Sequence, residues 1–357
     1  MVFQRAAMRE FASNAAAIFV ALFFILLTVI LIRLLSQAAG GRLPPDAVLY
    51  LIGFSALNNL STLLALTLFM SVLLTLTRVY RDSEMVVWFA SGLPLTAWIG
   101  PVLRFSLPIV AVIAAVSTYL SPWSQNKAQV YRTQLESRDD VSKVAPGTFR
   151  EASSGQRVFF VESIAENEAE VKNVFVALYQ EERLGVIVAA RGSIEREANG
   201  DRFAVLFDGR RYDGKPGTPD FRVTRFERYA IRIEAKEVGA IEQTPRGLAT
   251  PELIAKGEKP LLGELSWRIG LPIAALVLTL IAIPLSFVNP RAGRAANLIF
   301  AIFIFTAYIN ALGVAQAWIA QDKVSFALGA AAVHIVMVLV LFSLFAQRMS
   351  LFSFLRR

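Results

Sequence analysis

The sequence predicts a membrane protein in which six transmembrane helices flank an inserted all-β domain. Hydrophobic residues make up 55% of the 357 residues, which is more apolar surface than soluble cores bury. Six long stretches lack Asp, Glu, Lys and Arg. The segment Lys127–Arg268, in contrast, holds 46 of the 64 residues of these four types. We therefore expect this segment to lie outside the bilayer, between two groups of three spans.

Each uncharged stretch has at least 22 residues. A helix of that length reaches about 33 Å and crosses a bilayer core. The stretches are Phe11–Ile32, Ala47–Thr77, Phe105–Asn126, Ile269–Pro290, Ala295–Gln321 and Val324–Gln347. A buried soluble helix would explain one such run, but six runs favour membrane spans.

The short loops predict the orientation of the chain, because cytoplasmic loops carry an excess of Lys and Arg. One side has only Arg33, Arg42 and Lys323 in its short loops. The other side has Arg5, Arg9, Arg78, Arg81, Arg104, Arg291, Arg294, Arg348, Arg356 and Arg357. This imbalance predicts that both termini are cytoplasmic and that the inserted domain is outside, in the periplasm of a bacterium with two membranes.

The inserted segment begins with a polar connector, Lys127–Lys143, for which we expect a helix. Short alternating runs rich in Val, Phe, Ile and Tyr follow, separated by Asn-Gly, Asp-Gly and Pro-Gly turn signals. The runs are Arg157–Ser163, Val171–Tyr179, Gly185–Ala190, Arg202–Phe207 and Phe221–Glu234. They predict an antiparallel β-sandwich or a partly open roll.

We expect three parts along the chain. Residues 1–126 hold the first three spans, with a short cytoplasmic helix at about 82–92. Residues 127–260 hold the β-domain and its linkers, including Pro245–Lys259, and residues 261–357 hold the last three spans.

Several kinds of site are excluded or disfavoured. The chain has no cysteine and one histidine, His334, so a thiolate site or a site with two imidazoles is impossible. Gly209–Lys215 fits the start of a phosphate-binding loop, but Pro216 replaces the Ser or Thr that binds magnesium. The Lys127–Arg268 segment has 23 basic and 23 acidic residues, which argues against a nucleic-acid interface despite a pI of 9.9. We expect no cofactor on this chain.

The loop between the second and third spans predicts a short amphipathic helix. Asp82 or Ser83 would cap its start, Glu84 would lie in the first turn, and Gly92 before Pro94 would end it. Its body is apolar: Met85, Val86, Val87, Trp88 and Phe89. Such a helix either lies flat in the headgroup region or inserts into a cytoplasmic partner.

Two cytoplasmic segments resemble a known family. The residues Arg81-Asp-Ser-Glu-Met85 and Ala90-Ser-Gly-Leu93 are similar to the coupling-helix region of the lipopolysaccharide-export permeases LptF and LptG. The segment Ile283-Pro-Leu-Ser-Phe-Val-Asn-Pro-Arg-Ala-Gly-Arg294 resembles a second signature, closer to LptF members. The resemblance implies three spans, a periplasmic β-jellyroll and three further spans.

The resemblance also implies partners and a function. An LptG-like permease would form a heterodimer with this chain, and a dimer of LptB-like ATPases would bind ATP and contact the helix that starts near Glu84. The pair would extract lipopolysaccharide from the outer leaflet and pass it to LptC-like and LptA-like proteins. Asp82, Ser83 and Glu84 match the start of the coupling motif, with Met85, Trp88 and Gly92 also in the contact region.

Basic residues on the predicted outer side are candidates for the lipid phosphates, because in this family such residues at the end of the first span hold them. Arg33 is the first candidate, and Arg42 and Lys323 are weaker ones. An interfacial arginine that reaches water is the alternative for Arg33.

Two further features have alternative interpretations. In the loop Asn289-Pro290-Arg291 to Arg294, we expect membrane anchoring first and ATPase contact second. For His334 we expect a neutral side chain that bonds another helix, rather than a proton relay.

Other functions remain open. The chain could be a membrane-anchored periplasmic scaffold or a permease of another lipid or lipoprotein exporter. An intramembrane enzyme is the weakest hypothesis, since no span carries paired carboxylates or a Ser–Lys or Ser–His arrangement.

Overall fold

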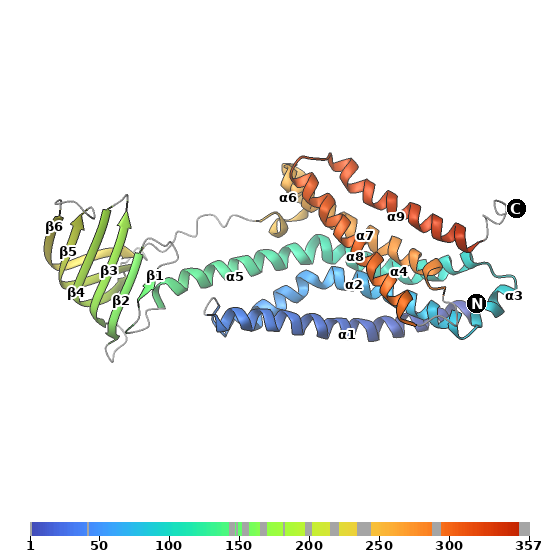
Figure 1. The fold of residues 1–357 in the computed structure, drawn as a ribbon, viewed down its shortest axis with the longest axis horizontal. Helices are drawn as coiled ribbons and strands as arrows, with labels where there is room; N and C mark the ends of the chain where they lie inside the picture. The colour runs from blue at the N-terminus through green and yellow to red at the C-terminus, as the bar shows by residue number, and fades with distance from the viewer. Residues whose placement is uncertain are drawn as a thin grey trace. The chain divides into compact units, whose positions relative to one another are not determined.

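The computed structural model describes residues 2–40, 43–142, 147, 149–151, 157–164, 170–180, 183–196, 202–214, 221–233, 244–287 and 294–349. Contacts divide the chain into two compact units. One comprises Met1–Gln129 and Gln243–Arg357 and is built from helices (Figure 1). The other, Val130–Glu242, contains the β-sheet.

The long helices are α1 (Val2–Ala39), α2 (Ala47–Arg81), α4 (Ile99–Ala115), α5 (Ser121–Ser142), α7 (Lys259–Leu285), α8 (Arg294–Ala320) and α9 (Phe326–Arg348). The short ones are α3 (Glu84–Ala90), α6 (Thr250–Lys256) and the 3-10 turns η1 (Leu95–Trp98) and η3 (Pro245–Gly247). A π-helical turn, η2 (Val116–Leu120), joins α4 to α5, so the third span is one long continuous helix.

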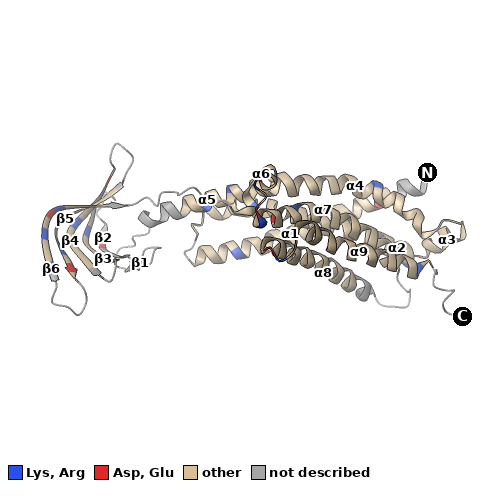
Figure 2. Cartoon of the chain, turned by 90° about the horizontal axis from the view of Figure 1, so that it is seen from above, with Lys and Arg blue, Asp and Glu red and all other residues tan. Residues whose placement is uncertain are grey.

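Six helices in the described part of the chain are long and apolar enough to cross a membrane, which confirms the predicted number of spans. They cover Ala7–Ala39, Ala47–Arg81, Leu95–Leu135, Lys259–Leu285, Leu298–Ala320 and Phe326–Arg348. Figure 2 shows that charged residues are sparse along these helices. The spans differ in burial, since α7 is the most enclosed and α1 is almost fully exposed along its apolar window. The exposed helix faces are the ones that lipid or a partner would cover.

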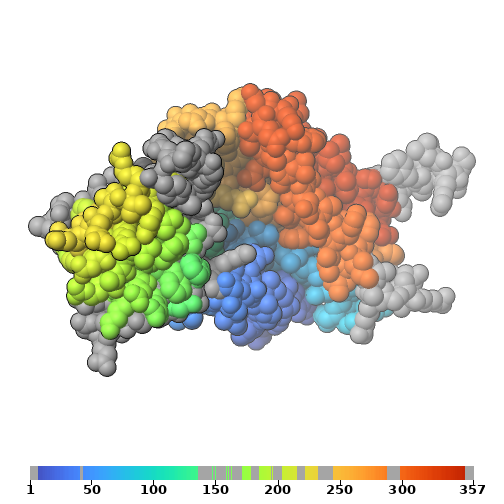
Figure 3. Space-filling model, turned by 60° about the vertical axis from the view of Figure 1, so that its left-hand side comes forward, coloured from blue at the N-terminus to red at the C-terminus, as the bar shows by residue number. Residues whose placement is uncertain are grey.

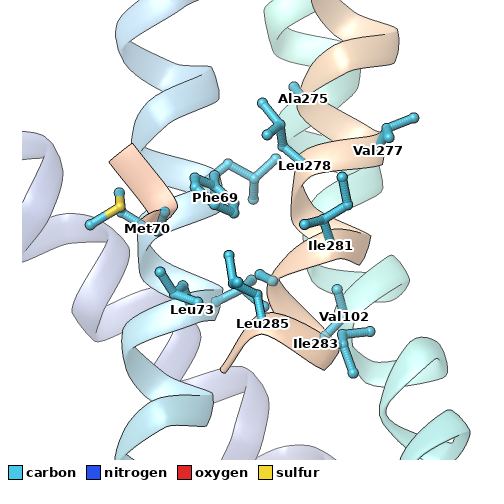
Figure 4. Close-up of a cluster of buried hydrophobic side chains, with 14 of the residues drawn as sticks. Phe69, Met70, Leu73, Val102, Ala275, Val277, Leu278, Ile281, Ile283 and Leu285 are labelled. Carbon is cyan, nitrogen blue, oxygen red and sulfur yellow. The ribbon is translucent and has the colours of Figure 1, made fainter. Parts of the chain in front are cut away.

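The core of the bundle lies where α2 packs against α7. Phe69 and Leu73 of α2 point toward Leu278 and Ile281 of α7, and Val102 of α4 closes the cluster (Figure 4). In the space-filling view the early helices, in blue and cyan, adjoin the late helices, in orange and red (Figure 3). The two groups of spans therefore form one bundle around α7.

The described residues of the inserted unit form an antiparallel sheet of six strands. They are β1 (Arg150–Glu151), β2 (Arg157–Ile164), β3 (Glu170–Gln180), β4 (Arg183–Arg196), β5 (Arg202–Gly214) and β6 (Phe221–Ile233). Their order in the sheet follows the sequence, from β1 to β6. The inserted all-β domain is confirmed, and its described strands pair only with sequence neighbours, whereas a jelly roll in the strict sense also joins non-consecutive strands.

The alternating pattern places the β-core correctly at several positions. Of the six apolar residues that the strand pattern assigns to the core, Val174, Val176 and Val205 are buried, whereas Val158, Phe160 and Phe207 are half-buried. The segment Gly209–Gly214 is strand, so no helix begins there to bind a phosphate. The strand β1 was not predicted, because two residues are too few to show alternation.

The expected linker Pro245–Lys259 is folded onto the bundle. It forms η3 and α6, and its side chains Leu248 and Leu253 are buried against Leu261 and Leu265 of α7. The Pro, Gly and charged residues of this segment suggested a linker, but its two leucines form a small buried cluster with two leucines of α7.

Candidate functional site

The predicted amphipathic helix is α3, which follows directly on α2. It begins at Glu84 and ends at Ala90, within the predicted range of 82–92. Met85 faces inward and is 1% exposed, whereas Val86 and Val87 are 64% and 67% exposed. Trp88 is half-buried against the core of the bundle. One side of α3 therefore anchors the helix, and the other presents bare aliphatic side chains.

The start of α3 differs from the capping we expected. Asp82 ends α2 and Ser83 occupies the N-cap position in the left-handed region, with φ 60° and ψ 10°, and neither side chain caps α3. The Asp82 carboxylate instead accepts from the Nε of Arg81 at 3.2 Å. The Asp82 carboxylate forms ion pairs rather than a helix cap because Arg78 and Arg81 lie within four residues of it.

The end of α3 follows the prediction. Gly92 adopts a φ of 85°, and its N–H donates to the carbonyl of Phe89 at 3.0 Å. The N–H of Leu93 donates to the carbonyl of Trp88 at 3.1 Å. This pair of bonds is a Schellman motif, which favours glycine at the left-handed position.

Arg78, near the end of α2, links α3 to the first span. Its Nη2 donates to both carboxylate oxygens of Glu10 on α1, at 2.6 and 2.7 Å. Its Nη1 lies 3.5 Å from Glu84 and 3.6 Å from Asp82. We call these four residues the Arg78 cluster. One guanidinium thus connects α1, α2 and the first residue of α3, and Glu10 has no sequence signal that predicts this role.

An aromatic group joins α3 to the late spans at the same end of the bundle. The Tyr80 ring on α2 lies edge-on to Phe89 at 6.4 Å and to Phe287, just after α7, at 5.5 Å. The guanidinium of Arg348, the last residue of α9, lies 4.1 Å from the Phe287 ring centroid. Through these contacts, a movement of α3 would be transmitted to α2, α7 and α9.

The opposite end of the bundle contains a buried arginine, Arg268 of α7, which is 1% exposed. Its Nε donates to Glu264 at 3.0 Å, and its two terminal nitrogens donate to the Thr250 hydroxyl and to three backbone carbonyls, those of Pro245, Arg246 and Leu248. These bonds occupy all five donors of the guanidinium. Arg268 therefore holds η3 and α6 onto α7.

The π-helical turn η2 completes this attachment. The Ser117 hydroxyl donates to the carbonyl of Arg268 at 3.0 Å, and the Thr250 hydroxyl donates to the carbonyl of Thr118 at 2.6 Å. A π-helical turn frees backbone carbonyls from the α-helical ladder, and here one of them accepts from α6.

A polar cavity of about 380 Å³ adjoins Arg268. It is bounded by α2, η2, α5, η3, α7 and α8, and no sequence motif indicated it. It is lined by Asn58, Asn59, Ser61, Thr62, Ser117, Ser121, Gln125, Arg246, Glu264, Trp267, Arg268, Ile309, Asn310, Gly313 and Gln316. The spacing of Asn and Gln within otherwise apolar spans was the signal that could have revealed it.

The basic residues predicted to bind lipid phosphates are only partly described. Arg33 is exposed on α1, which continues beyond it to Ala39, so it lies within the helix rather than at its end. Lys323 is exposed in the turn between α8 and α9. Among the described residues neither is seen in an ion pair. Arg42 lies outside the described residues.

The predicted loop before α8 also falls largely outside the described residues. This applies to Asn289, Pro290 and Arg291, whereas Arg294 is the first residue of α8. Within the described part of the chain, no group of three or more acidic or histidine side chains is placed to hold a metal.

The hydrogen bond expected between His334 and another helix is present. Its Nδ1 lies 2.6 Å from the hydroxyl of Tyr308, which joins α9 to α8. Tyr308 is buried and His334 is half-buried. This contact ties two spans together by a hydrogen bond.

Comparison with known proteins agrees with this arrangement. Residues 5–347 match the model of the family described as "Lipopolysaccharide export system permease LptF/LptG". The chain is 28% identical over 309 residues to the lipopolysaccharide export system permease protein LptF of Escherichia coli K12, covering 85% of this chain and 84% of that protein. The LptF proteins of Escherichia coli O157:H7 and Shigella flexneri give the same values. With six spans, an inserted β-sheet and a match over nearly its whole length, the chain belongs to the LptF/LptG family of lipopolysaccharide export permeases.

Proposed function

We propose that this chain is the LptF-like subunit of a transporter that extracts lipopolysaccharide from the outer leaflet of the inner membrane. The subunit does not hydrolyse ATP. An LptB-like ATPase dimer does so, and α3 transmits the resulting movement to the spans. An LptG-like permease forms the other half of the membrane part, and LptC-like and LptA-like proteins receive the lipid in the periplasm.

The observation that carries this proposal is the two-sided packing of α3. Val86, Val87 and Phe89 are exposed, while Met85 is fully enclosed. A helix that lies flat on an anionic membrane is typically rich in Lys and Arg. The helix Glu84–Ala90 contains no basic residue and begins with an acid. These features favour a protein groove over the headgroup region, with the aliphatic side chains at the centre of the contact.

The orientation supports the same assignment. The arginines that the loop rule places in the cytoplasm include Arg78, Arg81 and Arg348, all at the α3 end of the bundle. Arg33 and Lys323 lie at the opposite ends of their spans, away from α3. In this orientation α3 faces the cytoplasmic ATPase, and Arg33 faces the outer leaflet, from which it would contact the phosphates of the lipid.

Co-purification tests the docking of α3. Pull-down of the detergent-solubilised chain with its permease partner is expected to recover the ATPase, and Glu84→Arg or Val87→Asp is expected to reduce recovery at least tenfold. The control is Glu252→Arg, the same charge reversal on exposed α6 at the other end of the bundle. If the α3 variants retain the ATPase as well as the control does, α3 is not the docking element.

A further inference from the structure

The polar cavity beside Arg268 is lined by side-chain amides, hydroxyls and an indole. It lies wholly within the helical unit. Its volume of about 380 Å³ falls in the range of roughly 300–1,000 Å³ that small-molecule sites occupy. Polar groups inside membrane spans are costly, so a cavity lined by them indicates water or a polar ligand.

Three side-chain amides in the lining use a donor to bond the protein itself. The Nδ2 of Asn59 donates to the carbonyl of Ser55 at 2.8 Å. The Nδ2 of Asn310 donates to the carbonyl of Thr306 at 2.8 Å. The Nε2 of Gln316 donates to the Oε2 of Glu264 at 3.1 Å.

These bonds fix the orientation of each amide. In each case the nitrogen must be the donor, so the oxygen and the second N–H remain for a ligand. No described residue is seen to donate to these three oxygens. An amide that offers both an acceptor and a donor matches a hydroxyl group, which also does both, better than a phosphate oxygen, which only accepts.

The charged groups of the lining strengthen this selection. Arg268 has all its donors occupied, and its charge is balanced by Glu264 at 3.0 Å. The buried ion pair is thus internally satisfied and offers little to an anion. Arg246 is the remaining lining cation, and it is exposed at the rim.

Two further groups in the lining fit a sugar. Trp267 provides a flat, half-buried aromatic wall, and the apolar face of a pyranose ring packs against such a surface. The hydroxyl of Ser121 is buried without a partner among the described residues, and an unsatisfied buried hydroxyl indicates a site for water or a ligand hydroxyl.

We propose that this cavity binds a hydroxyl-bearing sugar ring of the core oligosaccharide, the part of the glycolipid headgroup that lies beyond lipid A. The inference rests on the proposed transport function and adds a division of roles to it. The cavity recognises sugar hydroxyls through side-chain amides and an indole, whereas the exposed Arg33 contacts phosphate. A ligand without the hydroxyls would displace water from these amides without replacing its hydrogen bonds, which favours the hydroxyl-bearing ligand.

Photo-crosslinking in the complete transporter tests the proposal. A benzophenone amino acid is placed at position 310 in one variant and at position 33 in another, and each is mixed with two lipids. One is lipopolysaccharide with its core sugars, and the other is lipid A stripped of them but still phosphorylated. The adduct at 310 is expected to fall at least fivefold with lipid A, while the adduct at 33 stays within twofold.

Substitutions provide an independent readout. In vesicles, Asn59→Leu combined with Asn310→Leu is expected to slow ATP-driven release of core-bearing lipopolysaccharide about tenfold relative to release of lipid A. Leucine is apolar and favours a membrane helix, so we expect these variants to fold. If Asn310→Gln replaces Asn310→Leu, the amide is kept, and we expect release of core-bearing lipopolysaccharide relative to lipid A to be mostly restored.

The outcomes separate this inference from the transport function. An adduct at 33 with none at 310 means that the cavity holds water only, and the inference fails while the function stands. Equal yields at 310 for both lipids, or equal slowing of both by the leucine variant, also overturns it. Absence of adducts at both positions together with no release contradicts the transport function itself.

Discussion

Two arginines at opposite ends of the same bundle are held in contrasting ways. Arg268 is 1% exposed and is enclosed by five acceptors from α7, η3 and α6. The Arg78 side chain is 36% exposed and is surrounded by three carboxylates on three separate elements. The first is built to stay in place. The second is shared among carboxylates on α1, at the end of α2 and on α3, and in the proposed function it would transmit movement between these helices.

The largest effect is expected from removing the buried arginine. Arg268→Leu leaves Glu264 charged, buried and without its partner, and it frees three backbone carbonyls. Breaking a buried pair in this way costs about 3–5 kcal/mol. We expect a corresponding loss of stability in a denaturant titration of the purified chain, together with release of η3 and α6 to a protease.

Two variants on α7 sharpen this result. Lys259→Ala removes an exposed ion pair with Asp322 and is expected to change stability by less than about 1 kcal/mol. Arg268→Leu with Glu264→Leu removes both charges and is expected to be less harmful than Arg268→Leu alone. If Arg268→Leu unfolds like the unaltered chain, the buried pair does not hold this region.

The exposed arginine should affect coupling rather than folding. Arg78→Gln breaks the bidentate contact with Glu10 and the contact with Glu84, so α3 loses its link to α1. We expect the ATPase to remain bound within twofold while lipopolysaccharide released per ATP hydrolysed falls at least threefold. Parallel measurement of ATPase activity and lipid release in vesicles gives this ratio.

Arg81→Gln is the matched control, because the acidic partner seen for Arg81 among the described residues is the adjacent Asp82. It should leave the ratio near that of the unaltered transporter. The exchange Glu10→Arg with Arg78→Glu should recover coupling that each single change loses. Equal loss in Arg78→Gln and Arg81→Gln would show that only the net charge of this end matters.

The features that could be predicted from the sequence are those that depend on residues close together in the chain. The six spans were predictable because each is a run of uncharged residues long enough to cross a bilayer, and the strands because their side chains alternate. Gly92 was predictable as the end of α3, since a left-handed residue there favours glycine. These features depend on near neighbours in the chain.

The partners of Arg78 and Arg268 depend on tertiary packing instead. Glu10 is 68 residues from Arg78 in sequence, and Leu248 is 20 residues from Arg268. Local composition does not specify such pairs. For the same reason the sequence suggested a loose linker at Pro245–Lys259, and it gave no sign that residues from four spans enclose a polar cavity.

The hydrogen bond between Tyr308 and His334 should contribute far less to stability than the buried ion pair of Arg268. Tyr308→Phe removes the hydrogen bond to His334, and such bonds between membrane helices average about 0.6 kcal/mol. We expect a small, measurable loss of stability in a denaturant titration. Tyr119→Phe, at an exposed tyrosine, should cause none. A loss above about 2 kcal/mol would mean that this contact does more than join α8 to α9.

The smallest effect is expected at the turn before α3. An N-cap side chain typically contributes about 1 kcal/mol, but the Ser83 hydroxyl makes no such bond. Ser83→Ala should therefore alter neither stability nor ATPase recovery by a measurable amount. A clear loss of recovery in the same pull-down would indicate that this hydroxyl contacts the ATPase directly.

The most direct test joins the two ends of the bundle in one measurement. The photo-reactive residue at position 33 is used to quantify bound lipopolysaccharide in the complete transporter before and after ATP is added. We predict that the adduct is strong without ATP, decreases as ATP is hydrolysed, and stays unchanged on ATP addition in Glu84→Arg. An adduct at position 33 that ignores ATP in a transporter that still hydrolyses it would contradict the coupling of α3 to lipid extraction.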